Sequence, residues 1–476
     1  MNCRRRIWNR NPVLMLSATI AALALFSGCT VENSGATLPA PPSSTVPSAN
    51  SANSIFFDID PVNSSMTVKA DYIRAGVGAQ EFLLNPAFTV TEMVVDGHQI
   101  NPASVMTPVA VPFVDGYVAN DYRLTQFTTS LHIEYTGTLS GSTGSTRYAT
   151  ETIGPDFTFL RWETFCYPLF SPASGLADAL NVPIDLSMSV EVPTGYSVQF
   201  SSDTQSTQDL GNRTTVFTTA AKMNLGSFAA AIAQFQDAHL ASGDYYLLST
   251  TDMSAAVKTI DPVMNQAYQF LDQTYGARTF TMKLRVVQIP SSLGSFAVTD
   301  QHMAFDETIS YADPTSLQPL IHEFIHLGWN PMPPADSSVQ QSRFFDEALT
   351  VYLTYRTMAS IVGDLSAASE LAGFTNLRGY AVADLAPIKD WGVQGQGDLS
   401  YTIGALCLFK LSRLMGVAAF DAATRQYLTD YQATPVDFAK FCAEYESHSD
   451  NPQQVQQFFQ TWIYSTAYTS QISLTN

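Results

Sequence analysis

The sequence predicts a multidomain chain in which an N-terminal all-β domain, a saddle or sandwich, is followed by an α+β domain that ends in a helical subdomain. Between residues 54 and 235, short segments alternate apolar and polar residues, with turn signals such as Asp96-Gly97 between them. Residues 280–289 alternate strongly as one strand, and the pattern after residue 366 is helical to the end. A chain of 476 residues with 46% apolar residues can fill the cores of two or three domains.

The first 29 residues have the pattern of an export signal. A basic stretch with four arginines, Arg4, Arg5, Arg6 and Arg10, precedes an apolar stretch at residues 13–26, which is short for a membrane span. We therefore predict a signal peptide at residues 1–29 and an exported protein.

Phe26-Ser27-Gly28-Cys29 resembles the bacterial lipobox, in which small residues precede a cysteine that is lipidated. The segment that follows, residues 30–53, is rich in Pro, Ser, Ala and Thr and has the composition of a flexible tether. The resemblance implies a lipid anchor at Cys29 that holds the protein in the bacterial cell envelope. The alternative is an ordinary secretory signal with a chance cysteine.

The chain carries 42 acidic and 23 basic residues, a net charge of −19. Nucleic acids and anionic lipid headgroups have the same sign and would be repelled. We therefore expect no nucleic-acid partner and no membrane contact beyond the lipid anchor. The oligomeric state is left open.

If Cys3 leaves with the signal and Cys29 is lipidated, three cysteines remain: Cys166, Cys407 and Cys442. An odd number cannot pair completely. Cys407 and Cys442 could form a disulfide, and three buried free thiols are equally compatible with the sequence.

We place the β domain at residues 54–235 and the second domain at residues 236–476. Four segments carry the β prediction most clearly: residues 66–73, 88–95, 131–135 and 186–192. Further along, helical spacing predicts helices at residues 229–240, 253–275, 337–361, 400–415 and 452–464, with Gly416 ending the fourth.

The segment from Ile321 to Leu327, Ile-His-Glu-Phe-Ile-His-Leu, contains two imidazoles and a carboxylate at the spacing of a zinc site. On an α-helix, residues four apart share a face, so His322 and His326 can reach one metal ion. Glu323 is rotated by about 100° around the helix axis, where it can face a reacting water without ligating the metal. The alternative is a buried helix with two incidental histidines.

The surrounding residues favour a helix here. Ser316 can cap it, Pro319 falls in its first turn, and Gly328 can end it. An apolar stripe would bury one face: Leu320, Phe324 and Leu327.

A zinc site with two histidines needs a third protein ligand and an open position for water. The best candidate is Glu347, which 20 residues separate from His326. Its neighbour Asp346 could ligate instead, but the apolar periodicity of the second predicted helix places Glu347 beside the buried face. The remaining alternative is that Glu347 is a solvated helix carboxylate.

Three motifs resemble those of the gluzincin zinc metallopeptidases of the aminopeptidase N type, with the glycyl aminopeptidases as close relatives. His322-Glu-Phe-Ile-His326 followed by Gly328-Trp-Asn330 is similar to their HExxH-x-W-x-N segment, and the sequence Phe-Asp-Glu-Ala-Leu-Thr-Val-Tyr around Glu347 is similar to their ligand helix. Ser400-Tyr401-Thr-Ile-Gly404 is similar to their Y-x-K-G segment. The likeness extends loosely over most of the chain after residue 54.

The resemblance implies a β saddle followed by a thermolysin-like α+β catalytic domain. It implies that His322, His326 and Glu347 hold zinc, that Glu323 is the general base, and that the Tyr401 hydroxyl donates to the oxyanion of the tetrahedral intermediate. A phenol in an apolar site donates well to such an oxyanion.

The chain departs from this family at four places. Gly328 displaces Trp329 and Asn330 relative to His326, Ala348 replaces a glycine, and Ile403 replaces a lysine. The aminopeptidases also carry a G-A/G-M-E-N strand whose glutamate holds the substrate α-amine, whereas residues 294–298 here, Gly-Ser-Phe-Ala-Val, contain no acid. The nearest acids in sequence are Asp300 and Asp306.

The sequence therefore predicts an exported, lipid-anchored zinc metallopeptidase of the bacterial cell envelope that acts on peptides or proteins. The missing acid predicts that cleavage does not depend on a free α-amine. Two alternatives remain: a zinc-containing envelope binding or assembly protein without peptidase activity, and a zinc hydrolase of non-peptide bonds.

Overall fold

The structure is a computed structural model that describes residues 53–111, 118–138, 153–180, 182–202, 205–224, 228–276, 283–291, 293–298, 302–331, 333–363 and 374–472. The predicted signal peptide, with Cys29, lies outside these ranges, and so does the predicted tether except for its last residue. The predicted domain boundaries stay predictions.

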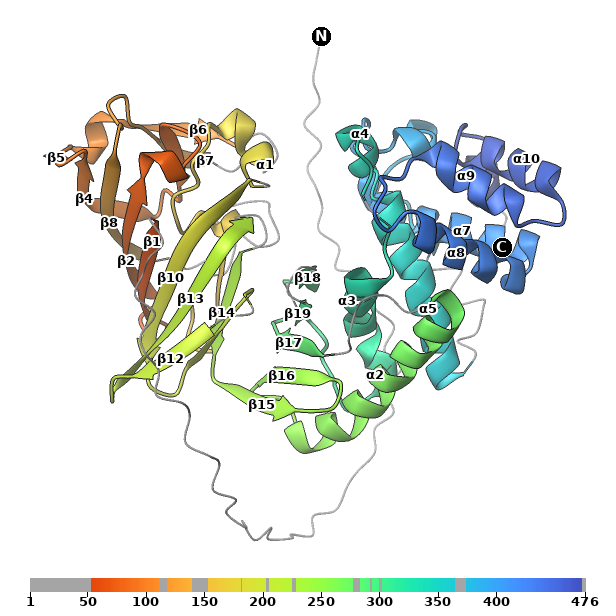
Figure 1. Cartoon of the computed structure of the whole chain (residues 1–476), viewed down its shortest axis with the longest axis horizontal. Helices are drawn as coiled ribbons and strands as arrows, with labels where there is room; N and C mark the ends of the chain where they lie inside the picture. The colour runs from red at the N-terminus through yellow and green to blue at the C-terminus, as the bar shows by residue number, and fades with distance from the viewer. Residues whose placement is uncertain are drawn as a thin grey trace, which may run out of the picture. The chain divides into compact units, whose positions relative to one another are not determined.

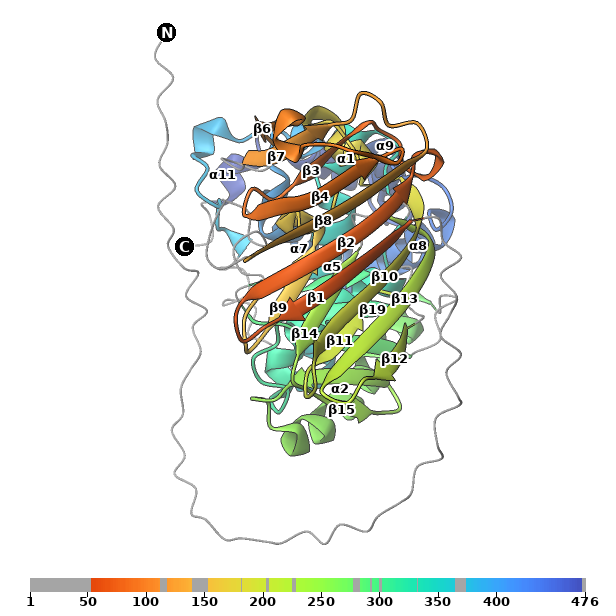
Figure 2. The ribbon, with the colours of Figure 1, turned by 90° about the vertical axis from the view of Figure 1, so that its left-hand side faces the viewer.

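The N-terminal region is built on an eight-stranded sheet with the order β12-β13-β10-β1-β2-β8-β4-β5 (Figures 1 and 2). The strands are β1 (Ser54–Asp60), β2 (Ser65–Ile73), β4 (Phe88–Val95), β5 (His98–Gln99), β8 (Ser130–Thr138), β10 (Pro183–Pro193), β12 (Gln205–Asp209) and β13 (Arg213–Asn224). In β2 every second residue from Met66 to Tyr72 is buried, which is the predicted alternation. The predicted β-rich character of this region is confirmed.

Two three-stranded sheets complete the β-rich region, with the orders β3-β7-β6 and β11-β14-β9. Their strands are β3 (Glu81–Leu84), β6 (Met106–Ala110), β7 (Val118–Arg123), β9 (Thr158–Arg161), β11 (Ser197–Phe200) and β14 (Ala229–Ala233). Buried residues from all three sheets form one apolar core cluster.

The helix predicted at residues 229–240 is wrong. This segment forms two strands, β14 and β15 (Phe235–His239). All five residues of β14 are buried, because Ala230 and Ile232 on one face and Ala229 and Ala231 on the other belong to two different apolar core clusters. A short strand buried on both faces is continuously apolar and lacks the alternation that would distinguish it from a helix.

A five-stranded sheet with the order β15-β16-β17-β19-β18 begins the second region (Figure 1). Its other strands are β16 (Gly243–Leu248), β17 (Leu284–Gln288), β18 (Phe296–Val298) and β19 (Met303–Asp306). Strands β16, β17 and β19 run parallel, and β18 pairs antiparallel with β19 at the edge of the sheet. Helix α3 packs against both β18 and β19.

The rest of this region is mainly helical, but the helical pattern predicted from residue 366 onward is wrong for the described residues 375–402, which form turns and short 3-10 segments. The principal helices of this region are α2 (Met253–Tyr275), α3 (Gln318–Gly328), α4 (Ser337–Gln340), α5 (Leu349–Val362), α7 (Ile403–Met415), α8 (Val417–Asp430), α9 (Phe438–Ser447), α10 (Pro452–Trp462) and α11 (Thr469–Ile472). Gly416 follows α7 as predicted. The helices share one apolar core with part of the five-stranded sheet.

The single helix predicted at residues 337–361 is interrupted. Arg343 has a left-handed backbone, with φ of 55°, and separates α4 from a π-helical turn at Phe344–Ala348 that leads into α5. The apolar spacing predicted the buried face of this segment but not the interruption at Arg343. Hydrophobic periodicity reports which residues are buried and does not report the backbone φ of a single residue.

Cys166, Cys407 and Cys442 are buried and free, so the alternative of a disulfide between Cys407 and Cys442 is wrong. Within the described ranges no single helix has the length and apolar composition of a membrane span, and only α7 and α8 together, bent by 120°, meet that test.

Candidate metal centre

Helix α3 carries both histidines of the predicted site. It continues directly from a 3-10 turn, Pro314–Leu317, which is capped by the Asp313 carboxylate accepting a hydrogen bond from the backbone N–H of Thr315 at 2.9 Å. The predicted cap at Ser316 is therefore wrong, because Ser316 lies inside that turn and α3 has no side-chain cap. Pro319 in the first turn and Gly328 at the end are confirmed.

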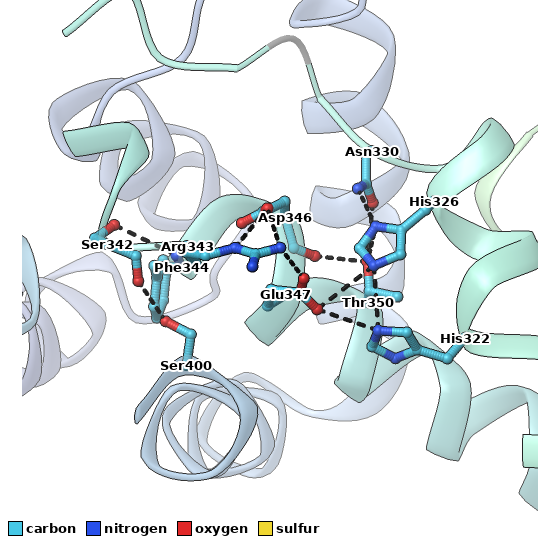
Figure 3. A network of polar contacts seen from close by, with 10 residues as sticks. All are labelled: His322, His326, Asn330, Ser342, Arg343, Phe344, Asp346, Glu347, Thr350 and Ser400. Atoms are coloured by element: carbon cyan, nitrogen blue, oxygen red, sulfur yellow. Dashed lines mark hydrogen bonds and ion pairs between the residues drawn. The ribbon is translucent and has the colours of Figure 1, made fainter. Parts of the chain in front are cut away.

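The predicted ligand atoms converge. Nε2 of His322 lies 3.1 Å from Nε2 of His326 and 3.1 Å from Oε2 of Glu347, and Nε2 of His326 lies 3.5 Å from the same oxygen (Figure 3). The adjacent Asp346 does not join this group, because its side chain is turned to Arg343 and is 43% exposed. The structure thus brings together the three residues that the sequence singled out.

These separations suit a tetrahedral zinc ion. With zinc–nitrogen distances of about 2.0–2.1 Å, two ligand atoms at tetrahedral positions lie about 3.3 Å apart. Two imidazole nitrogens and one carboxylate oxygen are also the donor set of zinc hydrolases, which leave one position open. The residues present therefore fit the ion.

The other carboxylate oxygen of Glu347, Oε1, accepts a hydrogen bond from the guanidinium of Arg343. Arg343 also contacts Asp346 at 3.3 Å (Figure 3). Glu347 is only 4% exposed, and its pKa is held well below the usual range because the charges of His326 and Arg343 and hydrogen bonds from the histidines outweigh the effect of burial. The carboxylate is therefore ionised, with Oε2 directed to the two histidines.

A chain of polar groups leads away from His326. Its Nδ1 lies 2.8 Å from the side-chain amide of Asn330, whose other end lies 3.0 Å from the Thr350 hydroxyl. That hydroxyl also lies 2.5 Å from the backbone carbonyl oxygen of Asp346. Nδ2 of Asn330 faces Nδ1 of His326, and Oδ1 of Asn330 accepts from the Thr350 hydroxyl, so the amide holds the imidazole ring in one orientation. These contacts leave Nε2 of His326 directed toward His322 and Glu347.

Glu323 lies on α3 with 6% of its surface exposed. Burial raises the pKa of Glu323 to about 8. The negative charges of Glu347 and Asp306 also raise this pKa, and the positive charge of His326 lowers it. A carboxyl group with its pKa near neutrality can both take and return a proton.

Tyr401 ends a 3-10 turn, Gly397–Tyr401, instead of lying in the first turn of an α-helix. Its ring lies 6.4 Å from the His322 ring, with 24° between the ring planes. Burial raises its pKa, and the Glu347 carboxylate raises it further. The hydroxyl therefore keeps its proton at neutral pH and can donate it in a hydrogen bond.

The strand that corresponds to the family's amine-binding segment is β18. Asp306, on the neighbouring strand β19, is fully buried and accepts hydrogen bonds from the hydroxyls of Tyr311 and Ser295. The guanidinium of Arg161, from β9, lies 3.9 Å from the centroid of the Phe296 ring and forms a buried ion pair with Glu163. The Asp306 carboxylate is thus already hydrogen-bonded inside the protein. The charged group that contacts β18 is the guanidinium of Arg161. Asp300 lies outside the described residues.

A second group of metal-binding residue types lies on the eight-stranded sheet: Glu92, His132 and Glu134. Lys69 already binds Glu134 at 2.7 Å, and Nδ1 of His132 lies 2.7 Å from Asp71. These internal ion pairs occupy the group, and we assign it no metal.

Sequence reasoning gave no role to Arg343, Asn330 or Thr350. Arg343 and Glu347 are opposite charges four residues apart, a spacing that could have indicated their contact. Asn330 lies beyond the end of α3, where helical spacing no longer applies, so its contact with His326 had no comparable signal.

No protein-family model matches the sequence, and no curated protein sequence matches it. Solved structures do. Yeast LTA4 hydrolase superposes with a TM-score of 0.55 at 14% identity, over 87% of this chain and 67% of that one. The M1 zinc metallopeptidase of Deinococcus radiodurans superposes with a TM-score of 0.53 at 13% identity, over 86% of this chain and 93% of that one. Another structure of the Deinococcus enzyme, bound to a Tyr-Ser-Ala substrate, gives 0.51.

At 13–14% identity these likenesses establish the fold. An N-terminal β-rich region followed by a helical region is the arrangement of M1 zinc metallopeptidases. The resemblance drawn from the three sequence motifs is confirmed at that level.

Proposed function

We propose that the chain is a zinc metallopeptidase that hydrolyses peptide bonds, with a thermolysin-like catalytic domain. The observation that carries the proposal is the convergence of Nε2 of His322, Nε2 of His326 and Oε2 of Glu347 within 3.1–3.5 Å of one another. The shared fold with M1 zinc metallopeptidases supports it.

His322, His326 and Glu347 would hold the zinc ion. When bound, zinc acts as a Lewis acid that polarises a carbonyl group and lowers the pKa of water to about 7. The protein's part is to hold both Nε2 atoms and one carboxylate oxygen in place, which the contacts of Asn330 with His326 and of Arg343 with Glu347 support.

Glu323 is proposed as the general base. Its buried carboxylate takes the proton of the attacking water and returns it to the leaving amine, the two transfers that amide hydrolysis requires. Tyr401 is proposed to donate a hydrogen bond to the oxyanion that the carbonyl oxygen becomes when water adds to the carbonyl carbon. Its ring is fixed beside His322, so this donor is positioned before the substrate arrives.

Cellular location rests on the sequence. We propose that the protein is exported and held in the bacterial envelope by a lipid on Cys29, with residues 30–53 as a tether. Cys29→Ser is expected to move the protein from the membrane fraction to the soluble fraction. If the variant stayed with the membrane, the lipid anchor would be excluded.

The second candidate is a hydrolase of non-peptide bonds. It is favoured by the fold shared with yeast LTA4 hydrolase, an enzyme named for a non-peptide substrate. The remaining alternative is a binding or assembly protein in which zinc has only a structural role. Such a protein would have the same three zinc ligands and would hydrolyse no substrate.

Metal analysis together with digestion of a mixed peptide library, read by mass spectrometry, tests the proposal. We expect one zinc per chain, its loss in His322→Ala and Glu347→Ala, and its retention without cleavage in Glu323→Gln. Bound zinc with no peptide cleaved by the unaltered protein would contradict a peptidase. An ester library would then separate the two alternatives.

A further inference from the structure

Two arginines flank the ring of Tyr401. The guanidinium carbon of Arg343 lies 5.8 Å from the ring centroid, and that of Arg378 lies 5.5 Å from it. In a chain with 42 acidic and 23 basic residues, this is a local concentration of positive charge beside the candidate centre.

The two arginines differ in what binds them. Arg343 is paired with Glu347 and Asp346, so its charge is compensated within the protein. Arg378 is exposed and forms no ion pair with any described residue. Asp398, on the same turn as Tyr401, interacts with Tyr380 instead. Among the residues that the structure describes, no carboxylate therefore pairs with the charge of Arg378.

The backbone is unusual at both positions. Arg343 and Arg378 have φ of 55° and 51°, and they are two of six non-glycine residues with positive φ in the described ranges. This left-handed region is disfavoured for residues with a Cβ, and residues held in it cluster at functional sites. That both arginines beside one tyrosine adopt it indicates that the fold specifies their positions.

The chain around Arg378 is anchored on both sides. Phe374 is buried, with its ring 5.0 Å from that of Tyr355 and 5.2 Å from that of Phe409. The Tyr380 hydroxyl donates to the backbone carbonyl of Gly395 at 2.8 Å. Arg378 lies between these anchors, so its guanidinium is presented from a fixed backbone.

We propose that Arg378 binds a carboxylate of the substrate, which makes acidic peptides the preferred substrate class. The inference rests on the proposed function, because it assigns a substrate to the same site. The planar guanidinium offers paired N–H donors that match the two oxygens of a carboxylate, and this charge-assisted pairing is stronger than a neutral hydrogen bond.

The distance from His322 to Arg378 limits how far the recognised carboxylate can lie from the scissile bond. The Tyr401 ring centroid is 6.4 Å from that of His322 and 5.5 Å from the Arg378 guanidinium carbon. An extended peptide advances about 3.3 Å per residue, so the carboxylate lies within about four residues of the scissile bond. An acidic side chain or the C-terminal carboxylate can supply it.

The experiment measures binding and turnover on four matched peptides. Two peptides have Glu beside the scissile position and two have Gln there. Within each of these pairs, one peptide has a free C-terminus and the other an amidated one. Binding is measured by fluorescence anisotropy on Glu323→Gln, so it does not depend on hydrolysis, and kcat/KM is measured on the unaltered protein. Comparison of Glu with Gln tests recognition of a side-chain carboxylate, and comparison of the free with the amidated C-terminus tests recognition of the terminal carboxylate.

We expect at least one carboxylate to strengthen binding about tenfold or more, the size of one charge-assisted hydrogen bond. Arg378→Gln should reduce that ratio to near one, and Arg378→Glu should reverse it, so that the Gln peptide with an amidated C-terminus binds best. Arg413 is an exposed residue of α7 that pairs with no acid in the described part of the chain, so Arg413→Gln should leave the ratio unchanged.

Equal binding of all four peptides, or an acidic preference that survives in Arg378→Gln, overturns the inference. Cleavage of the neutral peptide with no acidic preference would do so while leaving the peptidase proposal intact. Acidic preference in binding with no cleavage of any peptide would contradict the peptidase and support the carboxylate site.

Discussion

Arg343 and Glu347 form an ion pair that uses the carboxylate oxygen turned away from the two histidines. Oε1 of Glu347 accepts from the Arg343 guanidinium, and Oε2 lies 3.1 Å from Nε2 of His322. The arginine thereby fixes which oxygen is offered to the metal, so Glu347 is set to bind through one atom.

Arg343→Met keeps an apolar stem and removes the guanidinium. Because Glu347 can then rotate, we expect zinc affinity, measured by competition with a chelator, to fall about 10- to 100-fold, as for other groups that orient a ligand. Arg356→Met, which breaks a distant pair with Asp421, is the matched control and should keep zinc affinity. Tighter zinc in Arg343→Met would show that repulsion between the two cations outweighs orientation.

The contact between Asn330 and His326 gives a second prediction. Asn330→Leu removes the polar partner of Nδ1 and should weaken zinc binding about tenfold, whereas Asn330→Asp keeps a polar partner and should retain it. Thr350→Val, which removes only the hydroxyl, should have a smaller effect in the same direction. Equal zinc affinity in the Leu and Asp variants would mean that Asn330 does not orient His326.

Tyr401→Phe removes one hydroxyl and leaves the ring in its stack with His322. We expect kcat to fall about 10²- to 10³-fold, the usual loss for one oxyanion donor, with zinc content and melting temperature unchanged. Full turnover in this variant would assign the donor role to another group.

A free α-amine should not be required for cleavage. At β18 the residue over Phe296 is a cation, Arg161, and Asp306 is buried and already bonded, so neither offers a free carboxylate to a substrate ammonium. Burying an unpaired ammonium costs several kcal/mol, so N-acetylated peptides should be cut at least as well as free ones. The measurement is kcat/KM on matched pairs. A hundredfold preference for the free amine would show that an anchoring acid exists elsewhere.

Gly404 permits a close approach between α7 and the π-helical turn that carries Glu347. A Cβ at this position would lie 2.8 Å from the Cβ of Ala348. Gly404→Ala should therefore destabilise the protein by about 1–3 kcal/mol, read as a lower melting temperature. Gly78→Ala is the control, because a Cβ there would meet nothing within 4 Å. Equal stability of the two variants would contradict the contact.

How far the sequence predicts this molecule depends on the kind of signal. His322, Glu323 and His326 follow from helical spacing alone, and Glu347 follows from the buried face of its segment. The strand β14 was missed because a doubly buried strand and a buried helix have the same apolar content. Arg378 could not be found from any motif, since it reaches Tyr401 through a left-handed turn that periodicity does not encode.

The hydrogen bond from the Ser400 hydroxyl to the Ser342 carbonyl, at 2.7 Å (Figure 3), joins the turn that bears Tyr401 to the turn that bears Arg343. Gly397 lies equally close, since a Cβ there would come within 2.2 Å of the Gln341 carbonyl oxygen. Motion of one turn is therefore transmitted to the other. The proposed oxyanion donor and the orienting arginine belong to one cooperative unit, whose amides would exchange with solvent together and not one turn at a time.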